Sequence, residues 1–197
     1  MLGPVYTGMT DLTEACNRTS EVLAKVSDEQ LELRTPCEKM RVDELVAHIG
    51  GLALAFTAAA GKDFGPLTDT PPTDSAAIDA DWRTSYPQRL SALAAAWQNP
   101  DAWQGTTRAG GVELPAEVMG SVALAEVVIH GWDVARSIGR PYDGDPPTVQ
   151  ACLAHLAQFD AAGTEGMFGP AVPIADDAPA LDRVIALSGR DPAWRGP

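Results

Sequence analysis

Apolar residues recur at intervals of three and four along most of this chain, which is the spacing of helices with one buried face. Alternation of apolar and polar residues is nearly absent, and only 106–114, with Gly110-Gly111 at its centre, fits a short hairpin. The prolines and glycines of 61–74 predict a long loop, and 27–41 is expected to be a connection. The pattern predicts helices over about 10–26, 42–60, 75–99, 115–138, 148–162 and 180–188.

Four of these helices are long, and short or long connections join them. We therefore expect one domain over 1–197, an all-α four-helix bundle with additional short C-terminal helices and at most one small hairpin. A chain of this length can bury a core without disulfides or structural metals. Cys16, Cys37 and Cys152 form no C-x-x-C pair, so neither a disulfide framework nor a thiolate zinc site is predicted.

The charge balance narrows the function classes. The formal net charge is −13, which argues against nucleic acid as a partner because such surfaces concentrate Lys and Arg. No basic region followed by an apolar core opens the chain, so no secretory signal is predicted. No uninterrupted apolar run approaches the roughly 20 residues of a membrane span. We expect a soluble, cytoplasmic protein with no membrane partner.

The fourth predicted helix carries the candidate chemistry. Between Glu117 and Asp133 its residues are almost all apolar or small, interrupted only by Ser121, Glu126 and His130. A carboxylate in so apolar a helix is costly to bury unless something pairs with it. Glu126 and His130 stand four residues apart and therefore share one face of the helix.

The second predicted helix adds a histidine, because His48 lies on its inward apolar stripe. Two histidines, one carboxylate and an open fourth position make a catalytic zinc-type site. His48, Glu126 and His130 are therefore predicted to bind one divalent metal ion. The alternative is a buried Glu126–His130 hydrogen bond with His48 capped by a backbone carbonyl, because the sequence alone does not show that the two helices face each other.

Several segments carry a resemblance to a known family. Thr35-Pro36-Cys37, the run LVAHIGG at 45–51, the run EVVIHGWDVAR at 126–136 and LSGRDP at 187–192 resemble signatures of DinB-like metal-binding proteins related to mycothiol-dependent maleylpyruvate isomerase. The likeness is to the short actinobacterial branch and covers nearly the whole chain. It implies a DinB-like bundle in which His48, Glu126 and His130 hold the metal.

Two departures from the family affect what the resemblance implies. Met40 and Arg41 stand where the family usually has tryptophan and then serine or threonine, and the missing helix cap should cost about 1 kcal/mol. The isomerase also carries a C-terminal domain that contributes to its activity, and this chain is expected to end before it. Fold and metal site should therefore transfer better than the reaction.

The resemblance implies a thiol-dependent transferase or isomerase acting on a small electrophile, with mycothiol as the thiol cosubstrate. A metal ion would deprotonate a bound thiol and so create the nucleophile. The alternatives are a metal-dependent hydrolase that activates water and a non-catalytic metal-binding or ligand-sensing protein. Zinc is expected first, while nickel, iron and manganese also suit these ligands. The sequence leaves open a monomer or a homodimer.

Charged residues near the predicted ligands have two interpretations each. Asp133 either orients a metal-binding histidine from behind or pairs with Arg136. Arg136 and Arg190 are candidate anchors for a substrate carboxylate, with surface ion pairing as the more ordinary interpretation. No catalytic side chain is assigned beyond Asp133 and Arg136 as candidates.

Three remaining side chains are expected to be structural. Trp132 is interpreted as a core aromatic rather than a ligand platform, and His155 as a core histidine with its hydrogen bonds satisfied. Cys37 begins no recognisable nucleophile–base arrangement, so a structural thiol is favoured.

Overall fold

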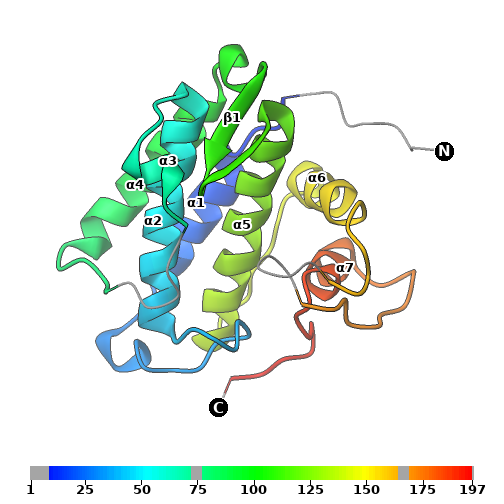
Figure 1. The fold of residues 1–197 in the computed structure, drawn as a ribbon. Helices are drawn as coiled ribbons and strands as arrows, with labels where there is room; N and C mark the ends of the chain where they lie inside the picture. Colours follow the sequence, from blue (N-terminus) through cyan, green and yellow to red (C-terminus); the bar gives the residue numbers. More distant parts are fainter. Residues whose placement is uncertain (1–8, 72–76, 164–168, 197) are drawn as a thin grey trace.

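A computed structural model describes residues 9–71, 77–163 and 169–196. Four long helices lie side by side and form the bundle in Figure 1. These are α1 (Thr13–Leu23), α2 (Val42–Gly61), α4 (Trp82–Trp97) and α5 (Ala116–Ser137). Each helix packs against two others, in the cyclic order α1, α4, α2, α5. The predicted all-α bundle is confirmed.

Shorter elements surround the bundle. Helix α6 (Pro146–Leu156) packs on α5, and α7 (Ala180–Leu187) packs on α6, so both lie to one side of the bundle in Figure 1. A single-turn helix α3 (Pro66–Asp69) lies within the predicted loop 61–74, and 3₁₀ turns occupy Asp28–Gln30 and Pro100–Trp103. Residues 72–76 of that loop are outside the described part of the chain.

The predicted hairpin is present, as β1 (Thr106–Ala109) paired antiparallel with β2 (Val112–Pro115). Gly110 and Gly111 form its two-residue turn with φ of 59° and 77°. Both residues need positive φ in the turn type that matches the twist of a hairpin, which is why glycine occupies both positions. The buried Thr107 hydroxyl donates to the carbonyl of Ala59 at 2.5 Å and ties the hairpin to α2.

The core fills the space between the four long helices. Helix α5 contributes most, because its residues are buried on nearly every face. The indole of Trp97 donates to the carbonyl of Phe56 at 3.1 Å, so a large aromatic ring is buried with its polar atom satisfied. Gly50 of α2 lies against the ring of Tyr86, where a Cβ atom would approach ring carbons at 2.7 Å. Close contact between α2 and α4 therefore depends on this glycine.

Helix bounds differ from the predicted ones where local signals compete. Helix α1 is three residues shorter at each end than the predicted 10–26, and α4 begins only at Trp82. Helix α6 begins at Pro146 rather than 148, because prolines are tolerated in a first turn and the Asp145 side chain caps it by accepting from the Thr148 N–H at 3.2 Å. It also ends at Leu156, six residues earlier than predicted.

The start of α2 is capped in a way the sequence analysis missed. Arg41 offers no side-chain acceptor, as expected, but its backbone N–H donates to the Glu44 carboxylate at 2.9 Å. This is half of a capping box, and it satisfies the backbone at the N-cap. The predicted loss of about 1 kcal/mol is therefore partly offset by Glu44.

By length and composition α2 and α5 are long and apolar enough to cross a membrane, although polar residues interrupt the apolar sequence of each. Of their most apolar windows, 61% and 78% are buried inside the bundle. Burial to this extent is typical of core helices, which can also be long and apolar enough to resemble membrane spans.

Candidate metal centre

The structure brings the three predicted metal ligands together between α2 and α5. His48 comes from α2, while Glu126 and His130 come from successive turns of α5. One potential ligand atom from each residue lies within 4.8 Å of the other two. Nε2 of His130 is 3.0 Å from Oε2 of Glu126, and the rings of His48 and His130 meet edge to face with centroids 5.0 Å apart.

Helix packing explains this convergence. His48 lies on the buried face of α2, three residues after the fully buried Leu45. Glu126 and His130 share one face of α5, and α2 and α5 pack directly against each other. The two histidines are buried and Glu126 is partly buried, with 19% of its side chain exposed. The donor set is therefore largely dry but reachable from outside.

These groups form an ion pair in the metal-free protein. Burial acts to raise the pKa of Glu126, but the hydrogen bond and the charge of His130 outweigh it and lower the pKa overall. For His130 burial acts to lower the pKa, while hydrogen bonds to Asp133 and Glu126 raise it to about 9. Imidazolium and carboxylate thus compensate each other in the core.

Asp133 holds the other nitrogen of the His130 ring. Its side chain is fully buried, and Oδ2 lies 3.1 Å from Nδ1 of His130. Nε2 therefore remains as the nitrogen directed toward Glu126 and available to a metal ion. A carboxylate behind a metal-binding histidine fixes the ring and its tautomer. The position of Asp133 agrees with the orienting interpretation of this residue.

Arg190, beyond α7, completes the group from the far end of the chain. Its guanidinium donates to Oδ2 of Asp133 at 3.3 Å, with 11% of the side chain exposed. Arg190 thus forms an ion pair, as the ordinary interpretation predicted, but with a buried carboxylate rather than at the surface. Arg136, the other candidate partner of Asp133, instead donates to the carbonyl of Pro192 at 3.0 Å and lies over the ring of Trp132.

Several buried polar atoms here have no hydrogen-bond partner within the described parts of the chain. They are Oδ1 of Asp133, Nε of Arg136, Nε of Arg190 and Nε2 of His155. Buried polar groups are normally paired with protein or water. The unpaired atoms therefore mark a polar interior, and the donor set of two imidazoles and one carboxylate fits a divalent metal ion.

The side chains expected to be structural have mixed outcomes. Trp132 is 2% exposed and is a core residue, as predicted. His155 is buried against Phe159, with ring centroids 5.1 Å apart. Its Nε2 has no hydrogen-bond partner within the described chain, although a histidine with satisfied hydrogen bonds was predicted. Burial lowers the pKa of His155, and the charge of Glu126 offsets part of that shift.

Two of the three cysteines are buried in surroundings that disfavour the reactive thiolate. Cys16 and Cys152 are buried, and burial is the main cause that raises the pKa of each thiol to about 12. Cys37 is half-buried and lies in the connection that precedes α2. No disulfide forms among the described cysteines.

Comparison with known proteins identifies relatives of this chain. Residues 12–135 match the family model described as the mycothiol maleylpyruvate isomerase N-terminal domain. The uncharacterized proteins MT0763 and Rv0738, from two strains of Mycobacterium tuberculosis, are 26% identical to this chain over 176 residues. The alignment covers 86% of this chain and 90% of each relative.

Two solved structures share the fold. The crystal structure of mycothiol-dependent maleylpyruvate isomerase superposes with a TM-score of 0.63 at 20% identity, covering 93% of this chain and 89% of that chain. A mutant of that isomerase, with a histidine replaced by alanine, gives a TM-score of 0.57 at 21% identity, covering 75% of this chain and 68% of that chain.

Proposed function

This chain belongs to the mycothiol maleylpyruvate isomerase N-terminal domain family, and from that premise we propose that it is a metal-dependent, thiol-using isomerase or transferase. The observation that carries the proposal is the convergence of His48, Glu126 and His130 within 4.8 Å. Three protein ligands leave one coordination position open, which separates catalytic sites from closed structural ones. The substrate we propose is a small electrophile, and the thiol is mycothiol.

Zinc is the first candidate for the metal ion, because two imidazoles and one carboxylate are a common catalytic zinc set. When bound there, the ion would lower the pKa of a thiol at the open position and supply a thiolate at neutral pH. The three cysteines of the described chain form no disulfide, which is compatible with a reducing compartment, and a cytoplasmic location is part of the proposal.

The protein's own residues would prepare the site. Asp133 keeps Nδ1 of His130 engaged, so the ring presents Nε2 to the ion without rotating. Arg190 balances the charge of Asp133 and holds that carboxylate in place. Apolar neighbours on α2 and α5 keep bulk water away from the ligands.

Elemental analysis of the purified protein tests the metal. We expect about one divalent ion per chain in the wild type, and loss of that ion in each of the variants His48→Ala, Glu126→Gln and His130→Ala. His155→Ala is the matched control, because it removes a buried histidine that is outside the ligand group. Full metal content in the His130→Ala variant would overturn the proposed ligand set.

A second experiment separates the possible reactions. The metal-loaded protein is incubated with maleylpyruvate or a haloarene electrophile, each with and without mycothiol. Turnover only with mycothiol supports the thiol-dependent function, and a mycothiol adduct in mass spectrometry identifies transfer. Ester hydrolysis without any thiol would identify a hydrolase instead. No turnover by fully loaded protein would favour a binding or sensing role.

A further inference from the structure

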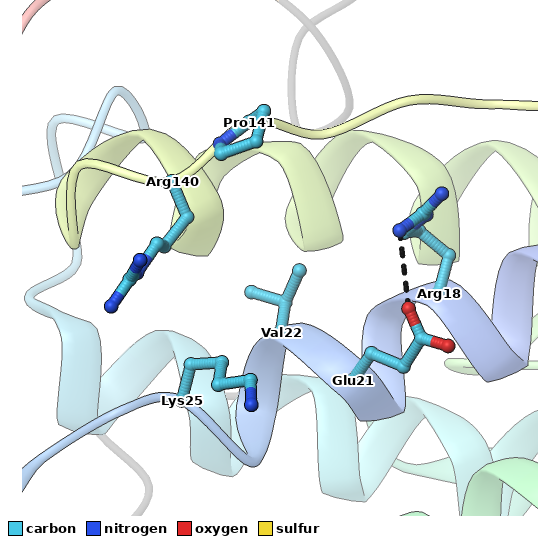
Figure 2. A pocket seen from close by; sticks show the side chains of 6 residues that line it. All are labelled: Arg18, Glu21, Val22, Lys25, Arg140 and Pro141. Atoms are coloured by element: carbon cyan, nitrogen blue, oxygen red, sulfur yellow. Dashed lines mark hydrogen bonds and ion pairs between the residues drawn. The ribbon is translucent and has the colours of Figure 1, made fainter.

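A second concave site lies away from the candidate metal ligands. It is a cavity of about 310 Å³ between α1 and the segment that follows α5 (Figure 2). Its volume is within the range of small-molecule sites. The lining residues are Arg18, Glu21, Val22, Lys25, Arg140 and Pro141.

The charge of this cavity is opposite to that of the whole chain. The protein has a net charge of −13 and only 14 lysines and arginines, yet three of them line this cavity against one carboxylate. Arg18 pairs with that carboxylate, since its Nη1 lies 3.1 Å from Oε2 of Glu21. Nε of Arg18 donates to the carbonyl of Asp143 at 3.2 Å, which fixes the guanidinium at the cavity wall.

Lys25 and Arg140 share the cavity with Glu21, but neither forms an ion pair with it. No ion pair within the described residues involves Lys25 or Arg140, although carboxylates outnumber cations almost two to one in this chain. Among the cations outside the cavity, Arg41, Arg83, Arg89, Arg108 and Arg190 form ion pairs within the described chain. Arg34, Lys39, Lys62, Arg136, Arg183 and Arg195 form none there, so the placement of Lys25 and Arg140 in one cavity carries the argument. In Figure 2 Lys25 and Arg140 border the same open space beside Val22.

The remaining surface of the cavity is apolar. Val22 forms part of it with only 5% of the residue exposed, and Pro141 contributes a second apolar wall. A ligand that suits this lining has two negative charges for Lys25 and Arg140 and a small apolar body against the exposed Pro141. We propose that this pocket binds a small organic dianion, either a phosphate monoester or a dicarboxylate. The proposal does not depend on the metal site or on the proposed reaction.

The ordinary explanation of these cations is helix capping. Lys25 lies two residues after the end of α1, and Arg140 lies three residues after the end of α5. Cations at helix C-termini stabilise a protein by about 0.3–1 kcal/mol each. Capping predicts a stability that depends on the two charges, but it predicts no saturable anion binding. The two explanations therefore differ in a measurable way.

Calorimetric titration of the metal-loaded protein with phenyl phosphate, inorganic phosphate and succinate tests the proposal. Ionic strength is held constant with potassium chloride, so that general screening does not change. We expect saturable binding of phenyl phosphate or of succinate, and the double variant Lys25→Gln/Arg140→Gln should weaken it at least about tenfold. The preferred probe identifies the class of dianion, and phenyl phosphate should bind more tightly than inorganic phosphate because only its ring can pack against Pro141.

The matched control is Arg34→Gln/Lys39→Gln, which removes two exposed cations elsewhere and should leave binding unchanged. An anion bound at the metal ion would still bind the Lys25→Gln/Arg140→Gln variant with unchanged affinity, and that result would overturn the proposal. Absence of saturable binding by all three probes would overturn it as well and leave helix capping as the explanation.

Discussion

His130 has a carboxylate at each ring nitrogen, and these two contacts separate the roles of neighbouring acidic residues. Glu126 faces Nε2, where a metal ion would compete with its hydrogen bond, whereas Asp133 faces Nδ1 and is fully buried. Of the two carboxylates, only Glu126 belongs to the group of potential metal ligands, together with His130 and with His48 from α2. We therefore expect Asp133 to position His130 rather than to bind the proposed metal ion, and its contribution is measurable apart from that of Glu126.

Asp133→Asn should weaken metal binding about 10- to 100-fold, the range observed when a hydrogen-bond partner of a metal ligand is changed. The substitution keeps the shape of the side chain but removes the charge that holds His130 and Arg190. Chelator competition measures the affinity, and circular dichroism verifies that the helices remain. Asp191→Asn is the control, because that exposed side chain only accepts from the N–H of Ala193. Equal affinities in both variants would refute the positioning role.

The ion pair predicts how the metal-free protein responds to pH. The raised pKa of His130 gives a stabilisation that is complete below its unfolded value of 6.5 and is lost as pH rises through about 9. The lowered pKa of Glu126 acts oppositely, with stabilisation present above 4.5 and lost as pH falls through the lower folded value. The free energy of unfolding should therefore decline between pH 6.5 and 9.

Urea unfolding of metal-free protein at a series of pH values measures this slope. His130→Asn should flatten the alkaline decline, because its side chain does not titrate. His155→Asn is the comparison, since the pKa of His155 is lowered and this residue cannot produce a decline near pH 9. A decline of equal size in the His130→Asn variant would assign the effect to another group.

At the scale of elements, the sequence predicted best the helices whose apolar pattern is densest. Helices α2 and α5 lie within one residue of their predicted bounds, because Gly61 ends α2, Pro115 and Gly139 flank α5, and both helices are mostly buried. The C-terminal ends of α1 and α6 were harder to predict, since neither helix is followed directly by a strong stop signal. Tertiary contacts then decide where the last turn ends.

The candidate site was likewise predictable from the sequence only in part. Spacing within one helix placed Glu126 and His130 together, and the apolar stripe of α2 placed His48 inward. The contact of Arg190 with Asp133 joins residues 57 positions apart and leaves no periodic signal in the sequence. The unpaired nitrogen of His155 was equally hidden, because the pattern predicts burial but not hydrogen bonding.

Two adjacent glycines of α2 provide a test of how closely the helices pack. A Cβ atom on Gly50 would lie 2.7 Å from the ring of Tyr86, whereas one on Gly51 would meet nothing within 4 Å. Gly50→Ala should therefore destabilise the fold by about 1–3 kcal/mol through overpacking. Gly51→Ala should stabilise it by about 0.5–1 kcal/mol, because alanine is the better helix former. Chemical denaturation measures both, and equal effects would contradict the close contact between α2 and α4.

At the scale of the whole molecule, the C-terminal segment reaches back to the bundle. Helix α7 packs on α6 rather than on the four-helix core, so its direct link to the site depends on residues beyond it. Arg190 contacts Asp133, and the carbonyl of Pro192 accepts from Arg136. The last part of the described chain therefore holds the charge behind His130, although it lies outside the region matched by the family model.

This link predicts that Arg190→Gln destabilises the protein by about 2 kcal/mol, because the buried Asp133 loses one of its two ionic partners and keeps only His130. Hydrogen exchange should increase across 180–196 while the amides of α2 and α5 remain protected. Arg195→Gln removes an exposed arginine of the same segment that donates only to nearby carbonyls, and its effect should stay within about 0.5 kcal/mol. If the two variants unfold at the same urea concentration, the Arg190 contact does not hold the C-terminal segment against Asp133 and the bundle.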